Sequence, residues 1–285
     1  MKKVRIVGVP EHFNLPWHMA IDEGAFASRG IDLEWTDVPE GSGKMCQLLA
    51  DQETDLAIVL TDGIVKSISD GNTSKIVQQY IASPLLWGIH VAENSSYENL
   101  EDLKGTTAAI SRFGSGSHLM SYVNASNLQW NLATLKFEVV HTLDKAVTAL
   151  TDKRADYFMW ERFTTKPLVD KKIFRRLADC PTPWPCFMIV ATDAFLEEHS
   201  GLLKHILAVI NRYTEEIKSI PSIDRTFANG YHQNLEDIQK WLSLTRWSQS
   251  PLGEAQLDKV KETLINLNLL GTILDNDRYL WNSKH

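Results

Sequence analysis

The sequence predicts an α/β protein of two similar lobes, each with a mostly parallel sheet, joined by two crossing strands. Short apolar runs alternate with helical patterns, an order that favours right-handed crossovers and parallel pairing. This alternation restarts after an extended segment at 86–92. The second half also repeats a spacing of the first at a constant offset, with Leu49, Asp51, Asp55 and Ile58 recurring as Leu150, Asp152, Asp156 and Met159.

The first lobe opens with a strand at 4–9 and a helix at 18–28, which Arg29-Gly30 ends. We then expect strands at 31–38, 55–60 and 75–82, with helices at 44–51 and 62–69 between them. Each expected strand is a short run rich in apolar residues, whereas the expected helices carry apolar residues three or four positions apart.

The second lobe has expected strands at 106–111, 136–140 and 156–159 and helices at 117–126 and 143–151. The segment at 88–92 is echoed at 187–191, and we expect these two segments to cross between the lobes. Helical patterns at 195–220, 222–235, 236–244 and 254–267 return to the first lobe. We therefore expect a discontinuous first lobe of residues 1–90 and 192–285 and a second lobe of residues 91–191.

Composition and charge narrow the class of protein. The net charge of 29 − 36 = −7, with no basic run, argues against nucleic acid as a partner. Cys46, Cys180 and Cys186 are too widely spaced to indicate a disulfide framework or a four-thiolate metal site, and no cofactor motif is present.

The N-terminus bears on location. Charged Met1-Lys2-Lys3 is followed by a strand pattern and not by the apolar core of a signal peptide. As written, the chain is expected in the cytoplasm, or in the periplasm or outside the cell if a leader was removed. Polar residues interrupt its longest uncharged stretch, 76–92, so we expect no direct insertion into a membrane.

Two turns rich in Gly and Ser, 40–44 and 111–118, each lie between a strand and a helix, one in each lobe. Glycine lets the backbone approach a ligand, and unpaired N–H groups of a first helical turn attract negative charge. Arg112 adds a planar cation, and Ser115 and Ser117 add hydroxyl groups. Each turn alone is also explained as a tight turn with a helix cap. Neither turn has the spacing of a dinucleotide-binding, P-loop or hydrolase motif.

Tryptophan and polar residues near strand ends are further candidates. Trp17, Trp87, Trp160 and Trp184 fall where a cleft is expected, either to stack on a planar ligand or to fill the core. Thr61, Asp62, Ser83 and Glu161 directly follow apolar strands, although Asp62 also fits a helix cap and Ser83 a turn. A half-buried Glu161 needs a partner, either an arginine or a cationic group of the ligand. The histidines lack metal-ligand spacing, so no metal is expected.

At these residues the chain resembles the substrate-binding proteins of ABC transporters of the nitrate, sulfonate and taurine type. Their superfamily also contains the fungal thiamine-pyrimidine synthases. The strand, the turn at 111–118 and the helix after it are similar to the second-lobe ligand loop of this family, and the similarity extends to about Leu203. It implies a type II periplasmic-binding-protein fold that closes on a small ligand. The family's ligand positions correspond here to Trp17, Gly43, Thr61, Asp62, Ser83, Ser115, Gly116, Ser117, His118 and Glu161. Arg112, Trp160 and Trp184 complete the candidate set.

The resemblance implies a non-catalytic protein that binds a small anion or a planar heterocycle, such as a sulfonate, nitrate, a carboxylate or a thiamine-pyrimidine-like compound. An ABC permease is the implied partner if the protein is exported. One alternative is an enzyme of the thiamine-pyrimidine type, although the scattered cysteines do not form the clustered-cysteine loop of those synthases. A cytosolic ligand sensor on the same scaffold is another.

Overall fold

The computed structural model describes residues 1–282, and the chain divides into two compact units. Unit 1 comprises Met1–Ser83 and the chain from Trp184 onward, and unit 2 comprises Pro84–Pro183. The boundaries expected after residues 90 and 191 lie inside strands β5 (Leu86–Ala92) and β10 (Phe187–Thr192). Each of these strands belongs along its whole length to the sheet of one unit, so the chain passes between units in the prolyl segments just before them.

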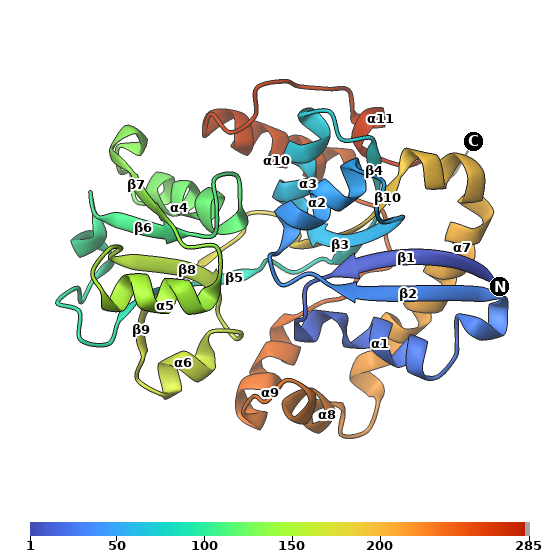
Figure 1. Cartoon of the computed structure of the whole chain (residues 1–285), viewed down its shortest axis with the longest axis horizontal. Helices are drawn as coiled ribbons and strands as arrows, with labels where there is room; N and C mark the ends of the chain where they lie inside the picture. The colour runs from blue at the N-terminus through green and yellow to red at the C-terminus, as the bar shows by residue number, and fades with distance from the viewer. Residues whose placement is uncertain (283–285) are drawn as a thin grey trace. The chain divides into compact units, whose positions relative to one another are not determined.

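The sheet of unit 1 has the strand order β2-β1-β3-β10-β4 (Figure 1). Its other strands are β1 (Lys2–Gly8), β2 (Ile31–Asp37), β3 (Leu56–Leu60) and β4 (Ser74–Ile81). β1 pairs in parallel with β2 and β3, whereas β10 is antiparallel to both β3 and β4. This sheet is therefore mixed, because β10 arrives from unit 2 and not through a strand–helix–strand crossover.

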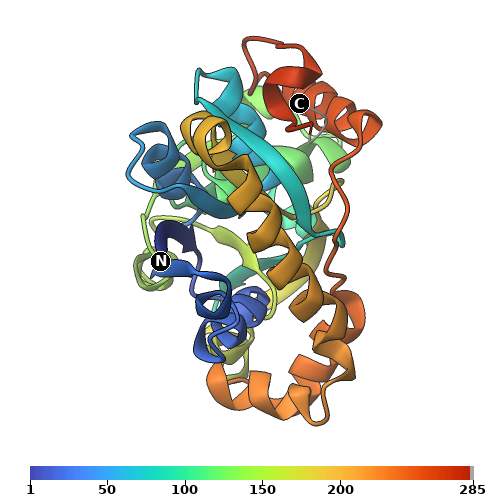
Figure 2. The same ribbon diagram turned by 90° about the vertical axis from the view of Figure 1, so that its right-hand side faces the viewer.

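Helices cover both faces of this sheet. α1 (Leu15–Asp22) and the long α7 (Asp193–Glu216) pack together on one face, and Figure 2 shows α7 crossing it. On the other face lie α2 (Ser42–Ala50), α3 (Thr61–Ser69) and α10 (Glu254–Asn266). The remaining helices are α8 (Ile223–Gly230), α9 (Leu235–Leu244) and the short α11 (Asn276–Tyr279).

The outer edge of β4 is covered by two later segments. The backbone N–H of Trp281 donates to Ile76 near the start of the strand, and Ala82, just past its end, donates to Arg246. Backbone groups at a sheet edge that are paired in this way are not available to a second chain.

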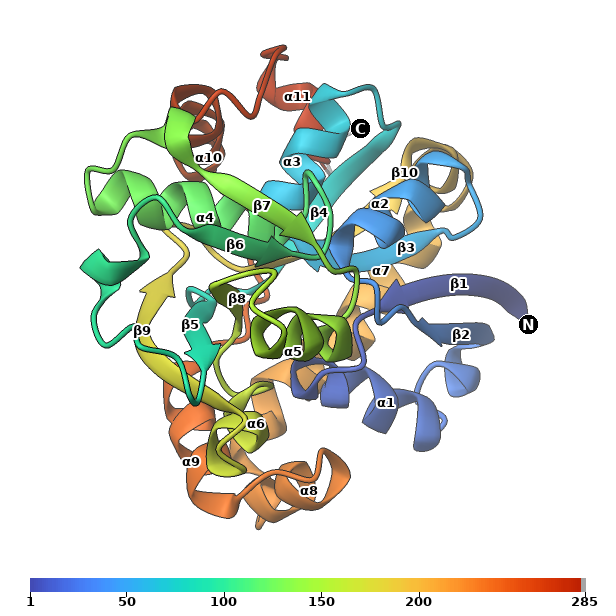
Figure 3. The same ribbon diagram turned by 60° about the vertical axis from the view of Figure 1, so that its left-hand side comes forward.

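The sheet of unit 2 has the order β7-β6-β8-β5-β9, with α4 and α5 on opposite faces (Figure 3). Its strands, besides β5, are β6 (Thr107–Ile110), β7 (Lys136–Val139), β8 (Tyr157–Glu161) and β9 (Phe174–Pro181). Its helices are α4 (Gly116–Asn127), α5 (Leu143–Thr151) and α6 (Lys166–Asp170). β6 is parallel to β7 and β8, and β5 is antiparallel to β8 and β9.

The two sheets share one topology, which confirms the two similar α/β lobes expected from the repeat. β6 takes the place of β1, β7 of β2 and β8 of β3. The echoing segments, now β5 and β10, occupy the same position, fourth in each order. β9, α6 and α11 were not expected from the sequence. β9 contains Arg175, Arg176 and Asp179, and its pairing with β5 at the sheet edge is made by backbone groups.

We expect β10 to be essential for the stability of unit 1. Ile189 at its centre is fully buried and lies between β3 and β4. Ile189→Ala leaves a cavity and should lower the free energy of unfolding by about 2–5 kcal/mol. Ile273, 64% exposed in the same unit, provides the control, and Ile273→Ala should change stability by less than about 0.5 kcal/mol. Urea denaturation measures both, and equal losses would contradict this role.

Candidate functional site

The carboxyl ends of β6 and β8 lie at the same edge of the sheet of unit 2. The two strands are parallel neighbours, with Ala109 paired to Phe158. Ser111, which follows β6, and Glu161, which ends β8, are therefore both at this edge. Open α/β sheets bind ligands at such edges, where loops enter helix N-termini.

Three serine hydroxyls meet where β6 passes into α4. Ser117 Oγ lies 3.1 Å from the hydroxyls of both Ser111 and Ser115, and it accepts the backbone N–H of Ser111 at 3.0 Å. Ser115 is the N-cap of α4, and its Oγ accepts the N–H of His118 at 3.3 Å. All three serines are more than nine-tenths buried. This serine cluster fixes the turn around the start of the helix.

The first turn of α4 keeps hydrogen-bond donors available. Within the described part of the chain, the backbone N–H groups of Gly116 and Ser117 have no acceptor. α4 has 12 residues and no acidic residue in its first turn, so its dipole places uncompensated positive charge at this end. Arg112, half-buried, is part of the same turn, because its carbonyl accepts the N–H of Ser115 at 3.1 Å. These groups together are complementary to an anion.

His118 supports this turn from within. Its Nδ1 accepts the N–H of Gly114 at 3.1 Å, so the neutral ring carries its proton on Nε2. The ring lies edge-on to Phe113, Tyr122 and Phe137 at centroid distances of 4.7–5.2 Å. Burial lowers the pKa of His118, which keeps the imidazole in the neutral form that this hydrogen bond requires.

Glu161 is buried, 4% exposed, and its partners lie in the turn after β8. Its Oε2 accepts the backbone N–H of Thr164 at 2.6 Å and the Thr164 hydroxyl at 2.9 Å. Burial raises the pKa of Glu161 to about 7, although these hydrogen bonds and nearby Arg162 oppose the shift. Half-buried Trp160 stacks on Phe158 at 5.3 Å. No hydrogen bond or ion pair joins Glu161 to the serine cluster within the described residues.

In unit 1 the Gly- and Ser-rich turn at 40–44 forms the start of α2. Ser42 Oγ accepts the N–H of Leu60 at 2.9 Å, which places the start of α2 beside the end of β3. The N–H groups of Ser42 and Gly43 have no acceptor among residues 1–282. This turn follows β2, however, and is not the topological equivalent of the turn after β6. The equivalent is the turn after β1.

Thr61, Asp62, Ser83 and Trp184 come together at the carboxyl edge of the sheet of unit 1. The Thr61 hydroxyl donates to the carbonyl of Pro185, and Trp184 Nε1 donates to Asp62 Oδ1 at 3.2 Å. Burial raises the pKa of Asp62 to about 6, which its own backbone N–H and the Trp184 indole partly oppose. Ser83 Oγ accepts the N–H of Arg246 at 3.1 Å. The strand ends thus meet as expected, but each side chain already has a partner in the protein.

Trp17 lies in the core of unit 1. It is fully buried, stacks on Phe26 at 5.9 Å and contacts Trp35 and Tyr80. This position favours the core-filling alternative for Trp17.

Sequence reasoning missed two aromatic residues at these edges. Trp247 forms a bridge with Ile81 at the end of β4, and its Nε1 donates to the Phe13 carbonyl. Nothing in the local sequence indicates this long-range pairing. Phe113 lies in the turn at 111–118 but is not among the residues expected to bind a ligand. Its position in a β-turn is the signal that could have identified it.

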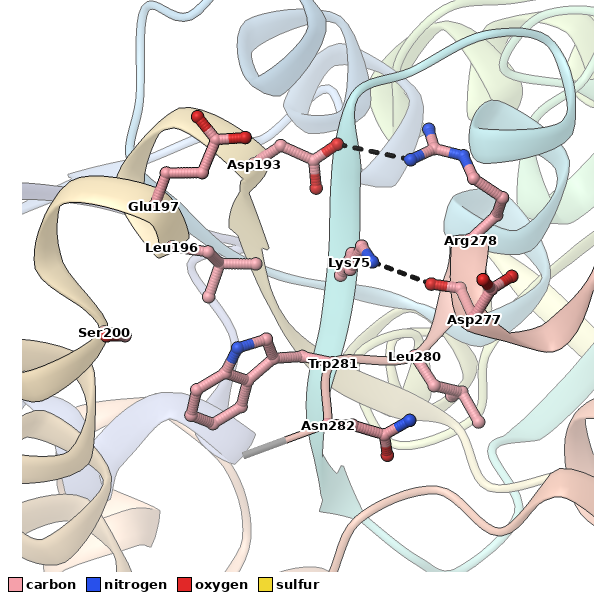
Figure 4. Close-up of a pocket in the computed structure, with 10 residues that line it drawn as sticks. All are labelled: Lys75, Asp193, Leu196, Glu197, Ser200, Asp277, Arg278, Leu280, Trp281 and Asn282. Atoms are coloured by element: carbon pink, nitrogen blue, oxygen red, sulfur yellow. Dashed lines mark hydrogen bonds and ion pairs between the residues drawn. The ribbon is translucent and has the colours of Figure 1, made fainter. Parts of the chain in front are cut away.

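Cavities occur in unit 1 at the other end of its strands, away from the candidate residues. Figure 4 shows one of about 530 Å³, beside the start of β4 and the start of α7. Its charged groups are largely paired, since Lys75 Nζ donates to the Asp277 carbonyl and Arg278 lies 3.5 Å from Asp193. None of the candidate residues lines it.

Metal-ligand clusters and membrane-spanning helices are both absent from the described residues. No group of three or more His, Cys, Asp or Glu side chains is placed to hold a metal ion in residues 1–282. Over the same range, the helices are too short or too polar to cross a membrane.

We expect the buried carboxyl of Glu161 to give the stability a specific pH dependence. The native state binds its proton up to about pH 7, whereas the unfolded state releases it near pH 4.5, so this contribution to stability falls as the pH rises between the two. Glu161→Gln removes the charge while its amide oxygen still accepts from Thr164. The free energy of unfolding of the variant, measured relative to that of wild type, should therefore be about 2.5 kcal/mol higher at pH 8 than at pH 5.

Urea denaturation at both pH values measures this difference, with the exposed Glu98→Gln as the control in the same unit. A Glu161→Gln difference that is the same at pH 5 and pH 8 would show that the carboxyl is not buried in the native protein.

The comparisons with known proteins agree with this architecture. Residues 87–180, within unit 2, match the family described as Ca3427-like PBP, where PBP denotes periplasmic binding protein. No curated protein matches the sequence. The Candida albicans CA3427 gene product, described as defining a new family with the generic periplasmic-binding-protein fold, is 26% identical, with a TM-score of 0.88 over 98% of this chain and 94% of that chain.

Two more distant structures also span the chain. The alkanesulfonate-binding protein SsuA from Xanthomonas axonopodis pv. citri, bound to MOPS, is 14% identical, with a TM-score of 0.83 over 99% of this chain and 98% of that chain. The ligand-binding component of an ABC-type import system from Staphylococcus aureus, with zinc bound, is 13% identical. Its TM-score is 0.76 over 99% of this chain and 97% of that chain. Together with the shared topology of the two units, these matches show that the chain has the type II periplasmic-binding-protein fold.

Proposed function

We propose that the protein is a non-catalytic binding protein for a small ligand with an anionic head group, and that unit 2 binds this head group at the start of α4. The observation that carries the proposal is the pair of N–H groups of Gly116 and Ser117, which have no acceptor in the described chain, beside Arg112. The unpaired N–H donors of a first helical turn need an acceptor, and an anionic oxygen is the strongest one.

The surroundings of these donors support a preformed site. The serine cluster and the His118–Gly114 hydrogen bond hold the turn in place without using the two N–H groups. A site whose donors are already oriented loses little conformational entropy when the ligand binds. The carboxyl of Glu161, at the same edge of unit 2, has a pKa that burial raises to about 7, so it is partly neutral at physiological pH and repels an anion less than an ordinary carboxylate would.

The resemblance to SsuA and to an import component supports a sulfonate as one candidate ligand and an ABC permease as a candidate partner. Closure of the two lobes on the ligand, expected from the sequence, stays a prediction.

A thermal-shift panel on purified protein tests ligand binding directly. The panel contains nitrate, phosphate, bicarbonate, acetate, benzoate, methanesulfonate, benzenesulfonate, MOPS, an aminopyrimidine and pyridoxal phosphate. A ligand at about 100 times its dissociation constant should stabilise the native state by about 2.7 kcal/mol, which raises the melting temperature by several degrees. An anion should give this shift, and a panel without any shift by an anion would contradict the proposed function.

Arg112→Gln should weaken the binding of the anion that gives the largest shift. Loss of a charge-assisted contact is expected to cost about 1.5–3 kcal/mol, or about 10-fold to 150-fold in the dissociation constant measured by calorimetry. Arg154→Gln is the matched control, because Arg154 is in the same unit and forms an ion pair with Glu138 on β7. Equal effects of the two variants would indicate a general loss of positive charge and not a contact at Arg112.

A further inference from the structure

Phe113 is unusual among the large apolar side chains of unit 2. Its side chain is 65% exposed, whereas the nearby Phe137 is half-buried and Phe158 is fully buried. An aromatic ring that stays exposed to water does not contribute the stabilisation that its burial would provide.

The exposure of Phe113 follows from a β-turn. The N–H of Ser115 donates to the carbonyl of Arg112 at 3.1 Å, which makes Phe113 the second residue of the turn and Gly114 the third. Gly114 has φ +79°, the value that a type II turn requires at this position and that favours glycine. The second residue of such a turn occupies its projecting corner. The backbone therefore presents the ring outward, next to the first turn of α4.

The ring is nevertheless held in position. His118 and Phe137 meet it edge-on at centroid distances of 5.2 and 6.1 Å. The hydrogen bond from Gly114 N–H to His118 Nδ1 also joins the corner of the turn to the helix. These contacts use the edge geometry that aromatic pairs prefer, and the large exposed fraction shows that much of the ring surface remains uncovered.

We propose that Phe113 determines specificity for planar ligands by stacking on a ring or other flat group attached to the anionic head. The inference rests on the proposed function, since it places the head group at Gly116 and Ser117, three and four residues along the same turn. A flat group bound to this head lies within reach of Phe113, and its burial there recovers the free energy lost by exposing the ring. The ligand class is then an aromatic or heteroaromatic acid and not a simple inorganic anion.

The test compares two pairs of probes that share a head group, benzenesulfonate with methanesulfonate and benzoate with acetate. Wild type should bind the aromatic member of at least one pair more tightly. Phe113→Ala should raise the dissociation constant of that aromatic probe by about tenfold, the upper range for an aromatic pair. The dissociation constant of its aliphatic counterpart should change by less than about twofold. Phe113→Leu, which keeps an apolar side chain without a ring, should resemble Phe113→Ala.

The outcomes separate this inference from the proposed function. Ile273→Ala, which removes an exposed apolar side chain from unit 1, should leave all four affinities unchanged. If the probes bind but Phe113→Ala keeps the aromatic preference of wild type, or weakens both members of a pair equally, Phe113 does not set specificity while the proposed function stands. If wild type binds none of the four probes and no other anion of the panel, both fail together.

Discussion

The pairing of β10 between β3 and β4 is the constraint on which the rest of unit 1 depends. Phe187–Ala191 pair with β3 on one side, and Phe187–Thr192 pair with β4 on the other. Without β10, both neighbours would keep unpaired backbone groups in the core, which is costly. Since β10 follows Pro183 in the chain, the sheet of unit 1 is complete only after unit 2 has been made. The same segment positions Trp184 and Cys186 against Asp62 and Thr61.

Parallel pairing brings the carboxyl ends of neighbouring strands together at one edge of each sheet. In unit 2, β6 and β8 end side by side, so the serine cluster and Glu161 lie at one edge although about 50 residues separate them along the chain. Burial at this edge has opposite effects on acids and bases. It raises the pKa of Glu161 and lowers that of His118, so both groups are closer to neutral than they would be in water. His118 serves the turn as a hydrogen-bond acceptor, a role that needs the neutral ring.

The sequence was most informative where side-chain pattern and local backbone agree. The strands at 31–38 and 86–92 and the helix at 143–151 were found within one residue, because apolar periodicity reports burial directly. β9 escaped notice because Arg175, Arg176 and Asp179 break any apolar pattern and backbone pairing alone makes it a strand. For the site, the local turn at 111–118 could be read from Gly and Ser. The partners of Asp62 and Ser83 could not be predicted from the sequence, since Trp184 and Arg246 are more than 100 residues away along the chain.

The first turns of the two units show how one topology can carry different chemistry. After β1, α1 begins at Leu15 with Pro16 as its second residue, and proline has no N–H to offer a ligand. The carbonyl of Phe13 in that turn accepts both the Tyr80 hydroxyl and the Trp247 indole, so the turn is tied into an aromatic cluster. After β6, by contrast, Gly116 and Ser117 keep their N–H groups. The repeat therefore preserves the path of the backbone, while Pro16 in one copy and Ser117 in the other, each the second residue of its helix, decide whether that position offers an N–H group.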